Sequence, residues 1–178
     1  MDEIAKGLGM SKKTIYQFVD NKSELVKLTL KDYLDDERSH IDGILKKSNN
    51  SIEEMVQMIE YFLQVVGEFN PTSLHDMQQY YPETWDIFND YRFNYMLGCI
   101  NDNLKNGVKQ GYYRKELKTE IIAKIYILGV ETLFNQDLFP AKQFVFLHIY
   151  REYLDYHLRG IVSPKGLKYL EEHNLFKD

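Results

Sequence analysis

The sequence predicts an all-α protein, with an N-terminal helix-turn-helix head followed by a larger helical body. Apolar residues recur every three or four positions along nearly the whole chain, which is the period of an amphipathic helix. Proline occurs only four times in 178 residues, so long helices are rarely interrupted. Serine, asparagine and glycine stand where one periodic stretch gives way to the next, as they do at helix ends.

The composition is that of an ordinary soluble globular protein of one or two domains. Apolar residues make up 44% of the chain and charged residues 28%. No stretch approaches the ~18 continuous apolar residues of a membrane span, and no charged-then-apolar leader is visible. Cys99 is the only cysteine, which excludes an intrachain disulfide and suits a reducing compartment. We therefore expect a cytoplasmic protein with no membrane association.

The first 22 residues predict two short helices joined by a tight turn. Gly9 can take the positive φ that a helix end favours, and Ser11 is a suitable N-cap for the second helix. Around the small Ala5, four apolar side chains are expected to face inward: Ile4, Leu8, Ile15 and Phe18. This arrangement is typical of a helix-turn-helix.

The polar face of the second helix predicts contacts with DNA. It offers positive charge, hydroxyls and an amide, which suit phosphates and base edges. Asn21 and Glu24 form a capping-box-like pair that places Lys22 in the first turn of a third helix. We expect Ser11 to cap the second helix and Thr14 and Gln17 to read bases. The phosphate-binding candidates are Lys12, Lys13, Tyr16 and Lys22.

The stretch MDEIAKGLGMSKKTIYQFVDNKSELV resembles the DNA-binding segment of TetR/AcrR-family transcriptional regulators. The matching residues are Ile4-Ala5, Gly9-Met10-Ser11, Thr14-Ile15-Tyr16, Phe18, Lys22 and Leu25. The Tyr-x-Phe-x-x-x-Lys-x-x-Leu tail distinguishes this match from a generic helix-turn-helix. Family members carry a further helix before this segment, so we expect an incomplete head in a truncated version of a longer protein. The alternative is a damaged DNA-binding domain.

Charge is distributed unevenly along the chain, whose net charge is −5. Residues 1–22 hold four lysines against three acidic residues, whereas the remainder holds 18 basic and 24 acidic residues. Because attraction to DNA depends on the local patch, a weakly basic head on an acidic body can still bind DNA. We expect modest non-specific binding.

A long helix is predicted from Asn21 to about Lys47, linking the head to the body. The acidic run 35–37 is expected to be a solvated face of this helix rather than a metal site. The polar residues 48–51 mark the predicted boundary between the head with its connecting helix (1–47) and an effector-binding and dimerisation domain (48–178). Ser51 with Glu54 is predicted to be the capping box of the next helix.

The body is predicted to consist of helices with short connections. Pro82 suits the first position of a helix. The stretch from Gly111 to Leu117 resembles the turn that TetR-family proteins place before their penultimate long helix. The expected helical ranges are 52–69, a short helix within 72–84, 82–110, 119–136, 141–159 and 164–174.

The helices predicted at 119–136 and 141–159 carry more apolar residues than one inward stripe requires. A homodimer in which this helix pair meets its symmetry mate as a four-helix bundle would cover the surplus. The family resemblance implies the same dimer.

Fourteen tyrosines and ten phenylalanines crowd the body, and the family resemblance implies an effector pocket among its helices. Simple core packing is the alternative for any one of these aromatics. The absence of an obvious charged residue among the candidates favours an apolar or aromatic effector. The candidates are Met58, Tyr61, Phe62, His75, Trp85, Phe88, Tyr95 and Tyr126.

No catalytic constellation, metal site or cofactor motif is visible in the sequence, so we do not expect an enzyme. His148 and Glu152 are spaced as two metal ligands or an acid–base pair could be, but no third ligand is visible. The sequence therefore predicts a ligand-responsive repressor that binds a palindromic operator as a homodimer. The alternative is a dimeric small-molecule-binding or protein-interaction module that does not bind DNA.

Overall fold

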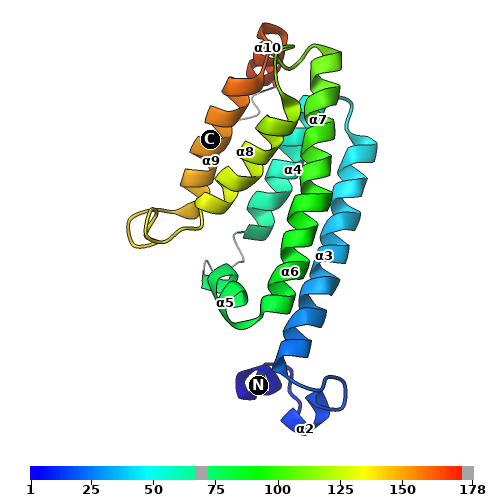
Figure 1. Ribbon diagram of the computed structural model, residues 1–178, viewed down its shortest axis with the longest axis vertical. Coiled ribbons are helices and arrows are strands. Elements are labelled where there is room, and N and C mark those ends of the chain that lie inside the picture. The colour runs from blue at the N-terminus through cyan, green and yellow to red at the C-terminus, as the bar shows by residue number, and fades with distance from the viewer. Residues whose placement is uncertain (67–71, 174–178) are drawn as a thin grey trace.

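The computed structural model describes residues 1–66 and 72–173, and its all-α architecture is the predicted one (Figure 1). In the described ranges, the only extended pairing is an isolated antiparallel bridge between Tyr113 and Val162. The helices are α1 (Asp2–Gly7), α2 (Lys12–Ile15), α3 (Lys22–Lys47), α4 (Ser51–Val66), α5 (Thr72–Tyr80), α6 (Pro82–Asp90), the π-helix η1 (Tyr91–Met96), α7 (Leu97–Gln110), α8 (Thr119–Thr132), α9 (Phe146–Ile161) and α10 (Pro164–Glu172).

The long helix α3 runs from the small head along the side of the body (Figure 1). Helices α6, η1 and α7 follow one another alongside α3, and α4 packs against both α3 and α7. Helix α8 packs on α7, and α9 lies beside α8 on the far side from α3. The head therefore lies at one end of the molecule, where α3 begins (Figure 1).

The body core forms where α4, α7, α8 and α9 meet, and the side chains at its centre are fully buried. Five apolar residues there have no exposed surface: Ile52, Met55, Leu104, Ala123 and Leu154. A buried polar network crosses the same region, with the Tyr113 hydroxyl 2.9 Å from the Ser51 carbonyl oxygen and 3.0 Å from the Asn103 Oδ1. Burying polar groups is tolerated here because each has a partner.

The start of α4 differs by one residue from the prediction. The Asn50 Oδ1, not Ser51, accepts hydrogen bonds from the backbone N–H groups of Ile52 (3.0 Å) and Glu53 (3.1 Å). Glu53 in turn accepts from the Asn49 N–H at 3.0 Å, one residue before the cap, so the arrangement resembles a capping box without being one. Ser51 is buried, and its hydroxyl donates to Gln110 at 2.9 Å. The predicted Ser51–Glu54 box is wrong because tertiary contacts with α7 occupy Ser51.

The predicted helix 82–110 is continuous, but it contains the π-helical segment η1 at its centre. Pro82 stands in its first turn, and Gly111, with φ 75°, ends it in the left-handed conformation. The predicted 119–136 and 141–159 helices are shorter than expected, since residues between Thr132 and Phe146 form turns. The expected end of α4 at Asn70-Pro71 lies outside the described residues.

The head core is smaller than predicted. Ala5, Ile15 and Val19 are buried, whereas Leu8 and Phe18 are 60% and 78% exposed. The expectation that Leu8 and Phe18 face inward is therefore wrong. Helix α2 ends after Ile15, and the following turn places Val19 against the core, with its N–H bonded to the Ile15 carbonyl at 3.3 Å.

Candidate functional site

Helix α2 presents the predicted DNA-reading face. Gly9 takes the expected positive φ of 64°, and Ser11 caps the helix by accepting the Thr14 N–H at 3.0 Å. The Ser11 and Thr14 hydroxyls lie 2.8 Å apart, so they present a joined pair of hydroxyls at the helix N-terminus. The other candidates are exposed on the head surface, Lys12 and Lys13 on α2 and Tyr16 and Gln17 in the turn after it.

Lys12 lies on this face and also forms an ion pair with α1. Its Nζ lies 2.8 Å from an Asp2 carboxylate oxygen, and this contact raises the pKa of Lys12 and lowers that of Asp2. Both side chains are exposed, so the pair is a weak one that a phosphate could replace. Lys13 is also exposed and projects from the next position of the helix.

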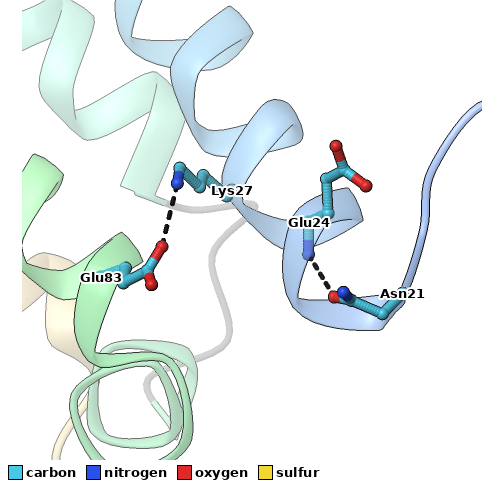
Figure 2. Close-up of polar contacts among 4 residues, drawn as sticks. All are labelled: Asn21, Glu24, Lys27 and Glu83. Carbon is cyan, nitrogen blue, oxygen red and sulfur yellow. Dashed lines mark hydrogen bonds and ion pairs between the residues drawn. The ribbon is translucent and has the colours of Figure 1, made fainter.

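Lys22 lies away from α2, at the joint between the head and the body. Asn21 caps α3 by accepting the Glu24 N–H at 2.9 Å, as expected (Figure 2). The Lys22 Nζ stands 5.8 Å from the centre of the Tyr81 ring, and a hydrogen bond with Tyr81 raises the pKa of Lys22. Lys22 therefore contacts the body through Tyr81, and its role as a phosphate ligand stays a prediction.

One turn farther along α3, Lys27 reaches the first turn of α6. Its Nζ lies 2.9 Å from the Glu83 Oε2, as Figure 2 shows. A hollow of about 400 Å³ with a mixed polar and apolar lining lies at this junction, between the beginning of α3 and the corner that joins α5 to α6. The start of α6 is thus the part of the body in contact with the first turns of the helix that carries the head.

A second, largely apolar cavity of about 150 Å³ lies inside the body. Side chains from α3, α4, α5, α6, η1, α7, α8 and α9 line it. Four of the eight predicted effector-binding residues are among them: Met58, Phe62, Phe88 and Tyr126. A tyrosine pair closes one side, with the hydroxyls of Tyr126 and Tyr150 3.2 Å apart.

The other four predicted residues lie elsewhere. Tyr61 stacks on His40 with 3.9 Å between ring centres, and the Tyr95 hydroxyl lies 2.7 Å from the Asp42 Oδ1. His75 is exposed on α5. Trp85 is half-buried behind Phe88, with 5.7 Å between their ring centres.

Sequence reasoning missed the charged residues of the cavity. Glu37, Arg92 and Glu131 all line it, so its wall is not purely apolar. Glu37 was expected on a solvated face, and this holds for the exposed Asp35 and Asp36 but not for Glu37. The helical spacing could have predicted the inward position of Glu37, because it falls in register with the buried residues of α3: Leu30, Leu34, Ile41 and Ile44.

The environment of Glu37 favours its protonated form. Burial raises its pKa to about 7, and the neighbouring hydroxyls of Tyr33 and Tyr91 offset this effect only partly. Tyr91 is 4% exposed, and its hydroxyl has no hydrogen-bond partner of regular geometry within the described ranges. The cavity thus contains a largely protonated carboxyl group, with the Tyr33 and Tyr91 hydroxyls beside it.

Arg92 is held against the wall of the cavity. Its guanidinium lies 2.7 Å from the Glu131 Oε2, and its side chain is only 12% exposed. It also stands 5.3 Å from the centre of the Phe88 ring, within cation–π range. The charge of Arg92 is therefore balanced by Glu131.

The outer surface of α8 carries an apolar stripe. Ile121, Ile125 and Leu128 lie on one helical face and are 57%, 55% and 51% exposed. On α9, Tyr156 is 79% exposed. These residues belong to the two helices for which a dimer contact was predicted.

Other chemistry is sparse. Within residues 1–66 and 72–173, no cluster of three or more His, Cys, Asp or Glu side chains could hold a metal ion. His148 and Glu152 are both exposed on α9. Over the same ranges no helix has the length and apolarity needed to cross a membrane.

No family model matches the chain, but individual proteins do. The chain is 22% identical over 170 residues to a Bacillus subtilis (strain 168) protein described as the uncharacterised HTH-type transcriptional regulator YvaF, over 93% of this chain and 86% of that protein. A TetR-family transcriptional regulator from Agrobacterium tumefaciens has a TM-score of 0.75 at 17% identity, over 91% and 86% of the two chains. The transcriptional regulator FadR from Bacillus subtilis, in complex with stearoyl-CoA, has a TM-score of 0.63 at 16% identity, over 90% and 87%. These similarities confirm the predicted fold class.

Proposed function

We propose that this chain, which has the fold of TetR-family transcriptional regulators, is a cytoplasmic regulator that binds a palindromic DNA operator as a homodimer. A small molecule in the body cavity would release it from the operator, which makes it a ligand-responsive repressor. The observation that carries the proposal is the head: a glycine turn and a Ser11-capped helix with exposed lysines, in the sequence pattern of that family.

The head residues divide into three groups in this proposal. Lys13, Tyr16 and Gln17 are exposed and would make the principal contacts in the major groove. Lys12 would exchange Asp2 for a phosphate, while the paired hydroxyls of Ser11 and Thr14 would meet the DNA at the helix N-terminus. Lys22 would act at the joint between the head and the body, where it contacts Tyr81.

A homodimer through α8 and α9 would present two heads. The exposed stripe formed by Ile121, Ile125 and Leu128 supports this contact, since such a stripe is buried when two helix pairs form a bundle. A two-fold dimer reads two half-sites related by the same symmetry, about 34–36 Å apart when they lie one DNA turn from each other. A palindromic operator follows.

Ligand binding would reach the head through α3 and the helix formed by α6 and η1. Tyr33 and Glu37 on α3 line the cavity, and so do Phe88 and Tyr91 on the other helix. The same two helices meet again at Lys27 and Glu83, beside the head. A ligand that changes the position of one helix relative to the other would change the spacing of the heads and so lower operator affinity.

Fluorescence anisotropy with duplex DNA flanking the protein's own gene tests the proposal. The protein should bind this DNA, and its affinity should fall as salt rises. Lys13→Ala should lower the slope of log affinity against log salt by about 0.9, the value of one phosphate contact. Lys109→Ala, an exposed lysine at the end of α7 that is remote from the head, is the matched control and should leave the slope unchanged.

The second candidate is a dimeric ligand-binding or protein-interaction module that does not bind DNA. The exposure of Leu8 and Phe18 favours it, because those side chains leave the head core partly uncovered. It predicts no salt-dependent affinity for any duplex, so the same titration separates the two candidates.

A further inference from the structure

We propose that the body cavity takes a ligand with an apolar body and a cationic amine, and that the amine pairs with Glu37. This proposal rests on the proposed function, in which the cavity is the ligand site of the regulator. It specifies in addition that the ligand is positively charged.

The balance of charges inside the cavity is the first support. Among the described residues, Glu37, Glu131 and Arg92 are the charged side chains that line it, and neither a lysine nor a histidine does so. Arg92 and Glu131 neutralise each other at 2.7 Å. Glu37 therefore has no basic partner in the cavity wall, and an ammonium group would supply one.

The second support is the buried hydroxyl of Tyr91. It lines the cavity and has no hydrogen-bond partner of regular geometry within residues 1–66 and 72–173. This hydroxyl lies beside Glu37, whose pKa it lowers, so its oxygen is placed to accept a hydrogen bond from a ligand that reaches the carboxyl group. An ammonium group carries several N–H donors, so one amine can donate to both Glu37 and the oxygen of Tyr91.

The third support is the aromatic wall. Phe62 and Tyr150 lie 4.8 Å apart between ring centres, and Tyr126 adjoins Tyr150 through their hydroxyls. The faces of aromatic rings attract cations, and the same rings cover an apolar body.

The opposite ligand charge is disfavoured at this position. A carboxylate or phosphate placed against Glu37 would set two like charges side by side in a partly desolvated site. Arg92 could receive an anion only by leaving Glu131. The cavity thus differs in its charge requirement from a site built for an anionic headgroup.

Isothermal titration calorimetry with phenylbutylammonium, phenylbutanol and phenylbutanoate tests the proposal, because the three probes share one apolar body. At a pH of about 8, where Glu37 is ionised, the ammonium compound should bind most tightly and phenylbutanoate most weakly. Glu37→Gln should weaken binding of the ammonium compound by roughly ten- to a hundredfold, the effect of losing a charged hydrogen bond, and leave phenylbutanol within about twofold.

Asp36→Asn is the matched control, since it removes an exposed carboxylate from the adjacent position of α3 and should change no affinity. Thermal melting of each variant checks that the fold is retained. Tightest binding of phenylbutanoate, an unchanged affinity of the ammonium compound for Glu37→Gln, or no binding by any of the three probes would overturn the proposal. The titration contains no DNA, so its result is independent of whether the chain regulates an operator.

Discussion

Lys27 and Glu83 connect the helix that carries the head to the part of the body that lines the cavity, with 2.9 Å between Nζ and Oε2. Lys22, just over one helical turn earlier on α3, makes a second contact with the same corner of the body through Tyr81. Both contacts involve the junction of α5 and α6, and the helix that begins there continues through η1 past the cavity. A displacement of that helix would therefore be transmitted to the first turns of α3.

Removing the Lys27–Glu83 pair should weaken the response to ligand more than the stability of the fold. Lys27→Ala should change the free energy of unfolding little, because the Glu83 side chain is 81% exposed and the pair is screened by solvent. Operator affinity with and without a saturating ligand should differ less in the variant than in the wild type, while ligand affinity measured without DNA is retained. The exchange Lys27→Glu with Glu83→Lys should restore the response. A full response in Lys27→Ala would show that the pair transmits nothing.

Two glycines of α7 should respond oppositely to alanine. A Cβ at Gly107 would overlap the ring of Tyr113, which is buried, whereas a Cβ at Gly98 meets nothing within 4 Å. We expect Gly107→Ala to lower the unfolding free energy by roughly 2 kcal/mol or more, since the core would have to shift. Gly98→Ala should leave it unchanged or raise it by up to about 1 kcal/mol, because alanine favours helix. Urea unfolding of both variants measures the difference, and equal effects would contradict the packing described.

The ionisation of Glu37 should make the free energy of unfolding fall as pH rises. Its pKa in the folded protein is about 7, above the usual 4.5, so the folded state holds the proton more strongly. The stabilisation this provides is complete below the unfolded pKa and is lost as pH rises through about 7. Glu37→Gln should therefore gain stability over the wild type as pH increases, on the order of 1 kcal/mol at a pH of about 8 after allowance for partial exposure.

Comparison of the two proteins at each pH separates Glu37 from other groups. Burial lowers the pKa of His157 to about 4, which gives a stabilisation that is lost as pH falls, and this effect is common to both proteins. The difference in unfolding free energy between them thus reports Glu37. A difference that stays constant between about pH 5 and pH 8 would show that the Glu37 carboxyl has an ordinary pKa.

The dimer contact should depend on the exposed stripe of α8. Ile125→Glu places a charge at the centre of that stripe, where pairing with a second copy would bury it without a partner. Analytical ultracentrifugation should find the wild type as a dimer and the variant as a monomer with an unchanged helical spectrum. Lys124→Glu alters the neighbouring exposed position and should leave the dimer intact. A dimeric Ile125→Glu variant would place the interface elsewhere.

The helix ends in and beside the head were predicted well, because they depend on local chemistry, whereas the ends of α8 and α9 in the body were not. Asn21 caps α3 and Gly9 takes a positive φ as expected, since a side-chain acceptor or a positive φ is needed at the position itself. Ser51 was assigned wrongly because α7 binds it, a contact between residues 59 positions apart that no local pattern reveals.

Only half of the predicted effector-binding residues line the cavity, and the pattern of α4 explains part of this result. That helix is apolar on much of its circumference, so periodicity cannot distinguish Met58 and Phe62, which line the cavity, from Tyr61, which stacks on His40. Glu37 was missed because it follows two exposed acids, although it occupies an inward position of α3. The division into residues 1–47 and 48–178 stays a prediction.

Selection from a random duplex library, using the protein expressed from its complete coding sequence, tests the central claim most directly. The account predicts enrichment of a palindromic site, bound by one dimer and lost with Lys13→Ala on α2 and with Gln17→Ala in the turn that follows it, both of which are exposed. The Lys109→Ala control should select the same site. Recovery of unenriched sequences, or of a site that the α2 variants bind equally well, would contradict the account and leave the chain as a ligand-binding module that does not read DNA.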